Sequence, residues 1–184
     1  MKKIGYKGIP WDISEPLAEA ARLGIVLCPA DDTSDCDALW GEYSIHEIEA
    51  AEHLSWFQST WAGIDSIVHA APFCDGTAAL CTSSGAYNRT IAEYLLGGCI
   101  LLLRHFDTYR DAQRAHIWHK HIPAGTLSGK QITVLGMGNI GRTFAGLAEA
   151  LGASVTGVRR SNIGSLRELL PGTDILVVLR DIIF

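Results

Sequence analysis

The sequence predicts an α/β fold with parallel, doubly wound sheets, and three observations support this prediction. Short apolar runs alternate with helical runs through the chain of 184 residues, which is the pattern of strands and helices packed in layers. A glycine-rich turn, residues 136–141, stands between one such strand and the helix that follows it. The composition, 48% hydrophobic and 19% charged, is typical of a globular protein with a sizeable core.

The first half of the chain reads as alternating strands and helices separated by turn residues. Pro16 falls in the first turn of the first predicted helix and Gly24 follows its last residue, the positions that these residues favour. The loops 59–65 and 83–86 follow predicted strands, where open α/β sheets place ligand sites. Strands are predicted at residues 3–6, 25–28, 38–40, 54–58 and 78–81, and helices at 15–23 and 45–51.

The second half begins with a long apolar helical run, residues 88–104, and a domain boundary is predicted near residue 90. The chain would then consist of domains 1–90 and 91–184. Further helices are predicted at 106–118, 140–151 and 166–170, a loop at 119–128, and strands at 131–135, 154–158 and 174–179.

The glycine turn has the residue types that a dinucleotide phosphate requires. Gly136 allows a tight turn, Gly138 lets the backbone approach a pyrophosphate, and Gly141 lets the helix pack near the strand. The start of the helix presents free N–H groups to the anion. The alternative is a glycine-rich turn that binds nothing. The predicted cofactor-binding residues here are Gly136, Met137, Gly138, Asn139, Ile140 and Gly141.

The end of the second strand in this domain predicts which dinucleotide is bound. An acidic residue there bonds the ribose 2′-hydroxyl of NAD, whereas an arginine accommodates the 2′-phosphate of NADP. This chain has Arg159, Arg160 and Ser161 and no acidic residue. Guanidinium groups offer paired donors to phosphate oxygens, so NADP is favoured over NAD. The alternative is that both arginines are merely solvated and NAD is bound less selectively.

Composition excludes several classes of protein. A net charge of −5 argues against a nucleic-acid partner. The longest apolar stretch, residues 95–103, is too short to span a bilayer, and the N-terminus has no signal-peptide pattern. Five cysteines without C-x-x-C spacing fit free thiols in a reducing cytoplasm, with neither disulfides nor a zinc site.

Two groups of titratable residues are weaker candidates for chemistry. The histidines around the second helix of this domain could form a base or metal site, although solvated or interface histidines are commoner. These are His105, His116, His119 and His121. The acidic segment 31–37 lacks a metal-ligand pattern and reads as a hydrophilic loop. No metal site is therefore predicted.

Several stretches carry a resemblance to a known family. They are residues 58–65 (QSTWAGID), 91–95 (IAEYL), Trp118, 127–130 (LSGK) leading into the glycine turn, 151–153 (LGA) and 170–178 (LPGTDILVV). The chain resembles, over nearly its whole length, the D-isomer-specific 2-hydroxyacid dehydrogenases, which include glyoxylate/hydroxypyruvate reductases and phosphoglycerate dehydrogenase.

The resemblance implies a flavodoxin-like substrate domain and an incomplete Rossmann cofactor domain with a cleft between them. It also implies that a substrate carboxylate is held by backbone N–H groups of Thr60, Trp61, Ala62 and Gly63, because successive amides can converge on an anion. The alternative is a tight turn closed by Gly63, with Asp65 capping a following helix. Trp61 is larger than is usual in the family, and would narrow the pocket or favour an apolar substrate side chain.

The activity implied by the resemblance is NAD(P)-dependent interconversion of a small 2-oxo acid, such as glyoxylate or hydroxypyruvate, and a D-2-hydroxy acid. A homodimer is implied in the same way. In the family, the His, acidic residue and Arg that handle the substrate follow the third cofactor strand, and this chain ends before them. No catalytic residue is therefore assigned. We expect a truncated dehydrogenase, inactive alone; the alternative is a non-catalytic nucleotide-binding or interaction module, or a decayed gene fragment.

Truncation would also affect the cofactor sheet. In the strand order 3-2-1-4-5-6 the first strand is paired on both sides. With only three strands in the chain, an open edge is expected beside Ile132 and Val134, where another chain could pair. The apolar terminus, residues 182–184, would also be poorly covered.

Overall fold

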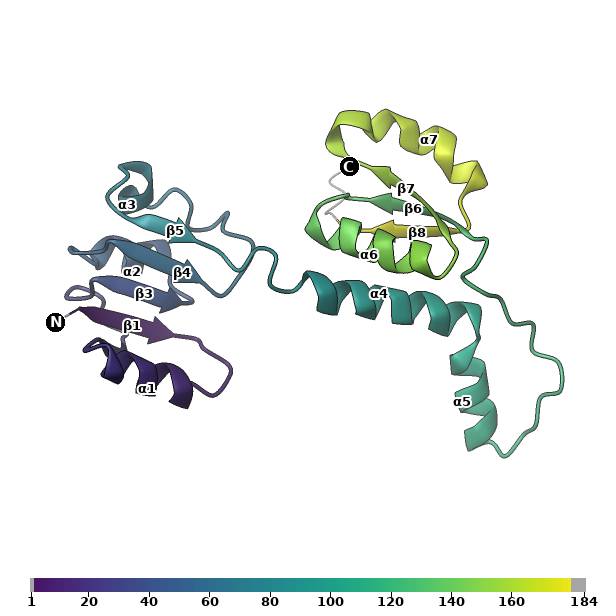
Figure 1. Cartoon of the computed structure of the whole chain (residues 1–184), viewed down its shortest axis with the longest axis horizontal. Coiled ribbons are helices and arrows are strands. Elements are labelled where there is room, and N and C mark those ends of the chain that lie inside the picture. The colour runs from purple at the N-terminus through teal and green to yellow at the C-terminus, as the bar shows by residue number, and fades with distance from the viewer. Residues whose placement is uncertain (1, 180–184) are drawn as a thin grey trace. The chain divides into compact units, whose positions relative to one another are not determined.

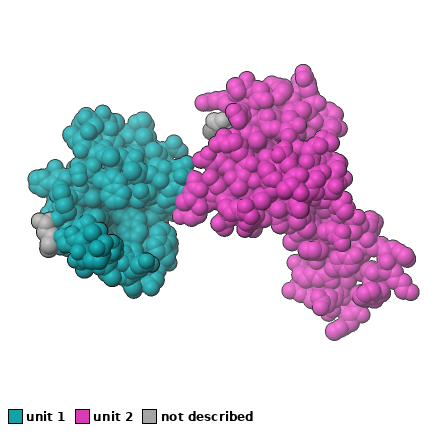
Figure 2. Space-filling model, viewed as in Figure 1, with its two compact units in different colours: residues 1–84 teal, residues 85–184 magenta. Residues whose placement is uncertain are grey.

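The computed structural model describes residues 2–179 (Figure 1). The chain forms two compact units, residues 1–84 and 85–184 (Figure 2), and each has its own parallel sheet. The division thus falls a few residues before the boundary expected near residue 90. The assignment of the two units as substrate and cofactor domains remains a prediction.

The first unit is built on five parallel strands in the order β2-β1-β3-β4-β5. This is the flavodoxin-like order 2-1-3-4-5, so the predicted doubly wound fold is confirmed. The core lies around Leu39, Ile48 and Phe57, which are fully buried. The strands are β1 (Lys3–Lys7), β2 (Val26–Pro29), β3 (Ala38–Gly41), β4 (Trp56–Ser59) and β5 (Ala79–Cys81), and the helices are α1 (Ser14–Arg22), α2 (Ile45–Ala50) and α3 (Ala71–Cys74).

The sequence analysis missed α3, a single helical turn with Pro72 near its start, because four residues are too few to show helical periodicity. Residues 65–69 form turns, and no helix begins at Asp65. The suggested role of Asp65 as a helix cap is therefore wrong.

Helix α2 is fixed at its start by a reciprocal pair of contacts. The backbone N–H of Ser44 donates to Glu47 Oε2 at 2.8 Å, and the N–H of Glu47 donates to Ser44 Oγ at 3.4 Å. Lys7 Nζ, at the end of β1, donates to Glu47 Oε1 at 2.6 Å. Glu47 thus joins the helix to the sheet. The bond from Lys7, followed by those from Ser44, lowers the pKa of Glu47 from 4.5 to about 2.

Replacement of Glu47 by Gln is expected to destabilise the first unit at neutral pH. A lowered pKa in the folded state gives stability that is present above the unfolded value of 4.5 and is lost as the pH falls towards 2. Because Lys7 is more than a third exposed, solvent screening limits the effect to about 1 kcal/mol or less. Urea unfolding of the native chain and of Glu47→Gln between pH 7 and pH 2 should show a difference in the free energy of unfolding that shrinks below pH 5. A difference that stays constant with pH would contradict this account.

Within the described residues, the second unit contains three parallel strands in the order β7-β6-β8. Helix α4 packs beside α6 against one face of this sheet (Figure 1), and Ala92, Val134, Phe144 and Ala148 are buried between them. The strands are β6 (Gln131–Leu135), β7 (Ser154–Val158) and β8 (Ile175–Val178); the helices are α4 (Asn88–Leu103), α5 (Phe106–Arg114), α6 (Asn139–Ala150), α7 (Leu166–Leu169) and the 3₁₀ turns η1 (Arg160–Ser165) and η2 (Leu170–Gly172).

The expected open edge beside Ile132 and Val134 is wrong. Strand β8 pairs directly with β6, with Ile132 opposite Ile175 and Val134 opposite Val177. Strand β8 is the third strand of this unit along the sequence. It takes the position of strand 4 in the order 3-2-1-4, on the other side of β6 from β7. The outer strands of the described sheet are β7 and β8. The apolar residues 182–184 lie outside the described residues.

Helix α5 is shorter than predicted. It ends at Arg114 rather than at residue 118, because His116 adopts the left-handed conformation (φ +56°), which an α-helix cannot continue. His105, also left-handed at φ +52°, separates α4 from α5. Both breaks fall at histidines, which carry no strong turn signal in a sequence.

Candidate cofactor and substrate sites

The glycine turn connects β6 to α6, and two of its glycines are required by its geometry. Gly136 has φ +111°, a conformation that side chains rarely adopt, and its N–H donates to the carbonyl of Val158 at 2.9 Å. A Cβ on Gly141 would overlap the carbonyl oxygen of Gly136. Met137 packs against the core of the unit, and Gly157 on β7 leaves room for its side chain.

The outer side of the turn has the properties of an anion site. In the part of the chain that the structure describes, the N–H groups of Asn139, Ile140 and Gly141 have no hydrogen-bond acceptor. Gly138 occupies the N-cap position without a capping side chain, and a Cβ there would meet no atom within 4 Å. The positive end of the α6 dipole and three unsatisfied donors therefore face open space.

A cation that sequence reasoning did not identify also lies at the turn. Arg142 Nη2 donates to Asn139 Oδ1 at 2.7 Å and Nη1 approaches the carbonyl of Met137 at 3.4 Å. These bonds hold the guanidinium beside the start of α6 and use two of its five N–H groups. Spacing along a helix predicts that residues 139 and 142 are neighbours, but not that the guanidinium turns back to the loop.

The residues expected to recognise the ribose lie at the end of β7, beside the glycine turn. Arg159, Arg160 and Ser161 are exposed, and neither arginine forms an ion pair with any described residue. The backbone N–H of Arg159 donates to Asn162 Oδ1 at 2.6 Å, and Asn162 Nδ2 approaches the carbonyl of Gly157 at 3.5 Å. Asn162, which the sequence analysis did not identify, thus fixes the turn that presents the two guanidinium groups.

In the first unit, the predicted carboxylate loop follows β4. The N–H of Trp61 donates to Ser59 Oγ at 3.0 Å, so one of the four expected donors is used within the protein. Within the described chain, the N–H groups of Ala62 and Gly63 have no acceptor, and both residues are exposed. Thr60 is buried. The loop therefore offers fewer free amides than the sequence analysis expected.

A cavity of about 300 Å³ lies beside this loop, at the carboxyl ends of β3 and β4. Its walls include Tyr43, Phe57, Trp61 and Ile67, with Gly63 from the loop. Tyr43 is buried, its hydroxyl has no partner among the described residues, and burial raises its pKa, so it remains protonated. The carboxyl ends of parallel strands are where open α/β sheets bind ligands.

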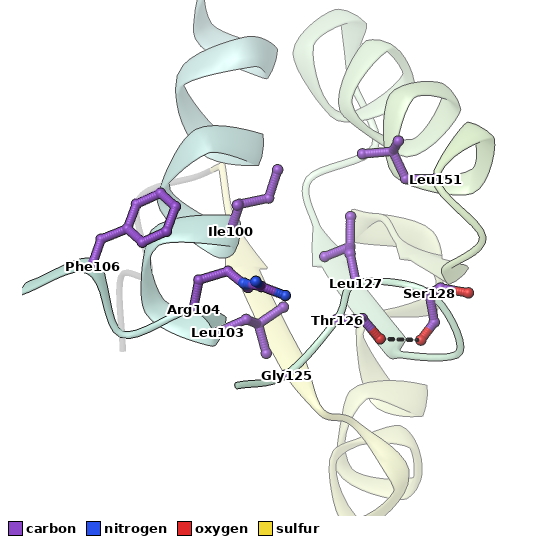
Figure 3. A pocket seen from close by; sticks show the side chains of 9 residues that line it. All are labelled: Ile100, Leu103, Arg104, Phe106, Gly125, Thr126, Leu127, Ser128 and Leu151. Carbon is purple, nitrogen blue, oxygen red and sulfur yellow. Dashed lines mark hydrogen bonds between the residues drawn. The ribbon is translucent and has the colours of Figure 1, made fainter. Parts of the chain in front are cut away.

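A second cavity, of about 360 Å³, lies in the other unit between the end of α4 and the segment 125–128 (Figure 3). Ile100, Leu103 and Leu151 contribute apolar walls, and the guanidinium of Arg104 extends towards the segment 126–128. Leu151 follows the last residue of α6. The glycine turn lies at the other end of this 12-residue helix, on the order of 18 Å away, so this cavity is separate from the anion site.

The weaker candidates do not assemble into a group of metal ligands within residues 2–179. No group of three His, Cys, Asp or Glu side chains there could hold a metal ion. Lysines on and next to β1 pair with the acidic loop instead: Lys2 with Asp37, Lys3 with Asp35, and Lys7 with Asp31. Nor does the described chain contain a helix both long and apolar enough to cross a membrane.

Comparison with known proteins agrees with this geometry. Residues 96–180 match the family model described as D-isomer specific 2-hydroxyacid dehydrogenase, NAD binding domain. A D-isomer specific 2-hydroxyacid dehydrogenase family protein from Aeromonas salmonicida is 26% identical, with a TM-score of 0.81 over 97% of this chain and 64% of its own. The resemblance predicted from the sequence and the Rossmann-like fold are thus confirmed.

Two further solved structures share the fold. An acyclic imino acid reductase in complex with NADPH and D-Arg is 19% identical (TM-score 0.80), over 98% of this chain and 66% of its own. D-Lactate dehydrogenase from Aquifex aeolicus, complexed with NAD and lactic acid, is 18% identical (TM-score 0.74), over 95% of this chain and 60% of its own. This chain spans about 60 to 66% of the length of these three structures.

Proposed function

We propose that this protein is an NAD(P)-dependent oxidoreductase of the D-2-hydroxyacid dehydrogenase family, interconverting a small 2-oxo acid and a D-2-hydroxy acid. The observation that carries the proposal is the glycine turn, where three unsatisfied N–H groups face open space in front of Gly138. A pyrophosphate there would accept these bonds and interact with the α6 dipole. When bound, the nicotinamide supplies the hydride chemistry.

The first unit would hold the acid. The free N–H groups of Ala62 and Gly63 lie beside the 300 Å³ cavity and suit a carboxylate. Glyoxylate and hydroxypyruvate are the first substrates to assay. The residues that exchange the hydroxyl proton in the family follow the third cofactor strand, and no residue of this sequence is assigned to their roles. The 184-residue polypeptide is therefore expected to bind cofactor with almost no turnover.

Titration with NADPH and NADH tests the proposal. Trp118 is the only tryptophan after residue 84, so a variant that keeps this tryptophan alone reports on the second unit by energy transfer to the reduced nicotinamide. Saturable binding of either nucleotide supports the proposal. A folded chain that binds neither would contradict it.

Cofactor preference is proposed to depend on Arg159 and Arg160, together with Ser161. Replacement of Arg159 by Ala is expected to weaken NADPH binding roughly 10- to 100-fold, since hydrogen bonds to charged groups contribute about 1.5–3 kcal/mol. Binding of NADH, which lacks the 2′-phosphate, should change less than about twofold. Arg167→Ala, another exposed arginine of the same unit, is the matched control. Equal losses for both nucleotides would refute a phosphate-specific role.

A homodimer through the second unit is also proposed. Helix α5 and the segment after it extend from the end of α4, away from the three-stranded sheet (Figure 1). Phe106, Ile117 and Trp118, on α5 and the segment after it, are 52%, 55% and 83% exposed, and Leu102, near the end of α4, is 70% exposed. An apolar surface of this kind is characteristic of a protein interface.

Light scattering coupled to gel filtration tests the dimer. The native chain is expected to elute as a dimer, and Trp118→Asp is expected to shift it to the monomer because a buried, unpaired charge is costly at an interface. Leu23→Asp, at a residue 56% exposed in the other unit, should leave the mass unchanged. A native monomer, or a Trp118→Asp dimer, would rule this interface out.

A further inference from the structure

Trp61 combines a fixed backbone with an exposed ring. Its N–H donates to Ser59 Oγ at 3.0 Å, and its carbonyl accepts from the N–H of Ser83 at 3.1 Å. The side chain nevertheless remains 61% exposed, and its indole N–H bonds to none of the described residues. The protein thus holds a large aromatic ring at the wall of the cavity without burying it.

The other walls of this cavity combine aromatic and aliphatic surfaces with polar side chains, among them Glu42, Ser44 and Ser66. Phe57 is fully buried and contacts Tyr43 edge to face, with ring centroids 6.2 Å apart. Ile67 adds an aliphatic surface, and the free N–H groups of Ala62 and Gly63 lie in the adjoining loop. A volume of about 300 Å³ is at the lower end of the range for small-molecule pockets, roughly 300–1,000 Å³. The site therefore places polar donors next to an aromatic wall.

We propose that Trp61 is a specificity-determining residue that selects 2-oxo and 2-hydroxy acids with an apolar, aromatic side chain over acids with none. This inference rests on the proposed function, because it assigns the cavity to the acid. With the carboxylate at the loop amides, a glyoxylate-sized acid leaves the indole in water. An aryl side chain covers the indole and gains an offset-stacked or edge-to-face contact.

The test compares two acids that differ only in the side chain. Glycolate and D-3-phenyllactate share the carboxylate and the 2-hydroxyl, and only the second carries a benzyl group. Titration of the 184-residue chain, with and without NADP⁺, is followed by the NMR shifts of the amides of residues 42–44 and 59–67. Phenyllactate is expected to bind about tenfold more tightly than glycolate, because its benzyl group gains an aromatic contact and buries apolar area.

Three variants isolate the role of Trp61. Trp61→Ala should reduce the preference for phenyllactate to about twofold or less, and Trp61→Phe should keep most of it because an aromatic face remains. Trp11→Ala removes another exposed tryptophan of the same unit, one that contacts Trp40 and does not line the cavity. This control should leave the preference for phenyllactate over glycolate unchanged.

Equal affinities for the two acids in the native chain would overturn the inference, as would failure of both to bind or an unchanged preference in Trp61→Ala. Nucleotide binding in the same preparation separates the two proposals. If NADPH binds while the acids are not discriminated, only the role of Trp61 fails. If a folded chain binds no nucleotide, the proposed function itself fails.

Discussion

Gly138→Ala is expected to leave the fold intact and to weaken binding of both NADPH and NADH roughly 10- to 100-fold, the equivalent of one charge-assisted hydrogen bond. Gly138 has φ −79°, which alanine adopts, and a Cβ there would meet no protein atom within 4 Å. The added methyl group instead projects into the open space at the start of α6, where the pyrophosphate is proposed to bind. Any effect must therefore come from the ligand that approaches this backbone.

Gly146→Ala provides the matched control for Gly138→Ala. Gly146 lies in the middle of the same helix, and a Cβ there also meets nothing within 4 Å. An alanine in a helix interior should raise stability by about 0.5–1 kcal/mol without affecting nucleotide affinity. Calorimetric titration with both nucleotides measures the comparison. Unchanged affinity in Gly138→Ala would show that the pyrophosphate does not bind at this turn.

Local elements of the fold were largely predictable because local patterns determine them. Strands β6 and β7 begin and end at the predicted residues, since each is a short β-branched run flanked by glycine or loop residues. Helix α5 was predicted too long because its polar face continues in sequence beyond Arg114. The left-handed conformation of His116, which ends it, has no signature in the neighbouring residues.

Strand order was the larger error, and its cause is non-local. The run 174–179 was identified correctly as a strand, but its sequence does not say on which side of β6 it pairs. The structure places it beside Ile132 and Val134, which are buried as a result. An edge that seemed open from counting strands is therefore closed by a strand already present in the chain.

The site residues likewise divide into those that a local sequence pattern reveals and those that depend on contacts made in the folded chain. The glycines of the turn have a spacing that sequence alone reveals, and two of them, Gly136 and Gly141, must avoid a Cβ because of the geometry of the turn. Arg142 and Asn162 act through contacts that their side chains make back to the loops, and no motif marks them. Conversely, the N–H of Trp61 was expected to be free for a substrate and is bonded to Ser59 Oγ.

Gly141→Ala is expected to act on stability, in contrast to Gly138→Ala. A Cβ at residue 141 would overlap the carbonyl oxygen of Gly136, a backbone atom held by the bond from its own N–H to Val158 and by the end of β6. Relief requires α6 to move from the sheet, where Phe144 and Ala148 are fully buried. The free energy of unfolding of the second unit should fall by about 2–3 kcal/mol, as in other overpacked sites.

Urea unfolding monitored separately in each unit measures this effect, because two units need not unfold in one step. Trp118 reports on the second unit, and the tryptophans before residue 84 report on the first, whose transition should not move. Gly146→Ala again serves as the control in the same helix. Native-like stability in Gly141→Ala would mean that the helix can shift at little cost. The close approach of α6 to β6 would then not be the reason for a glycine at this position.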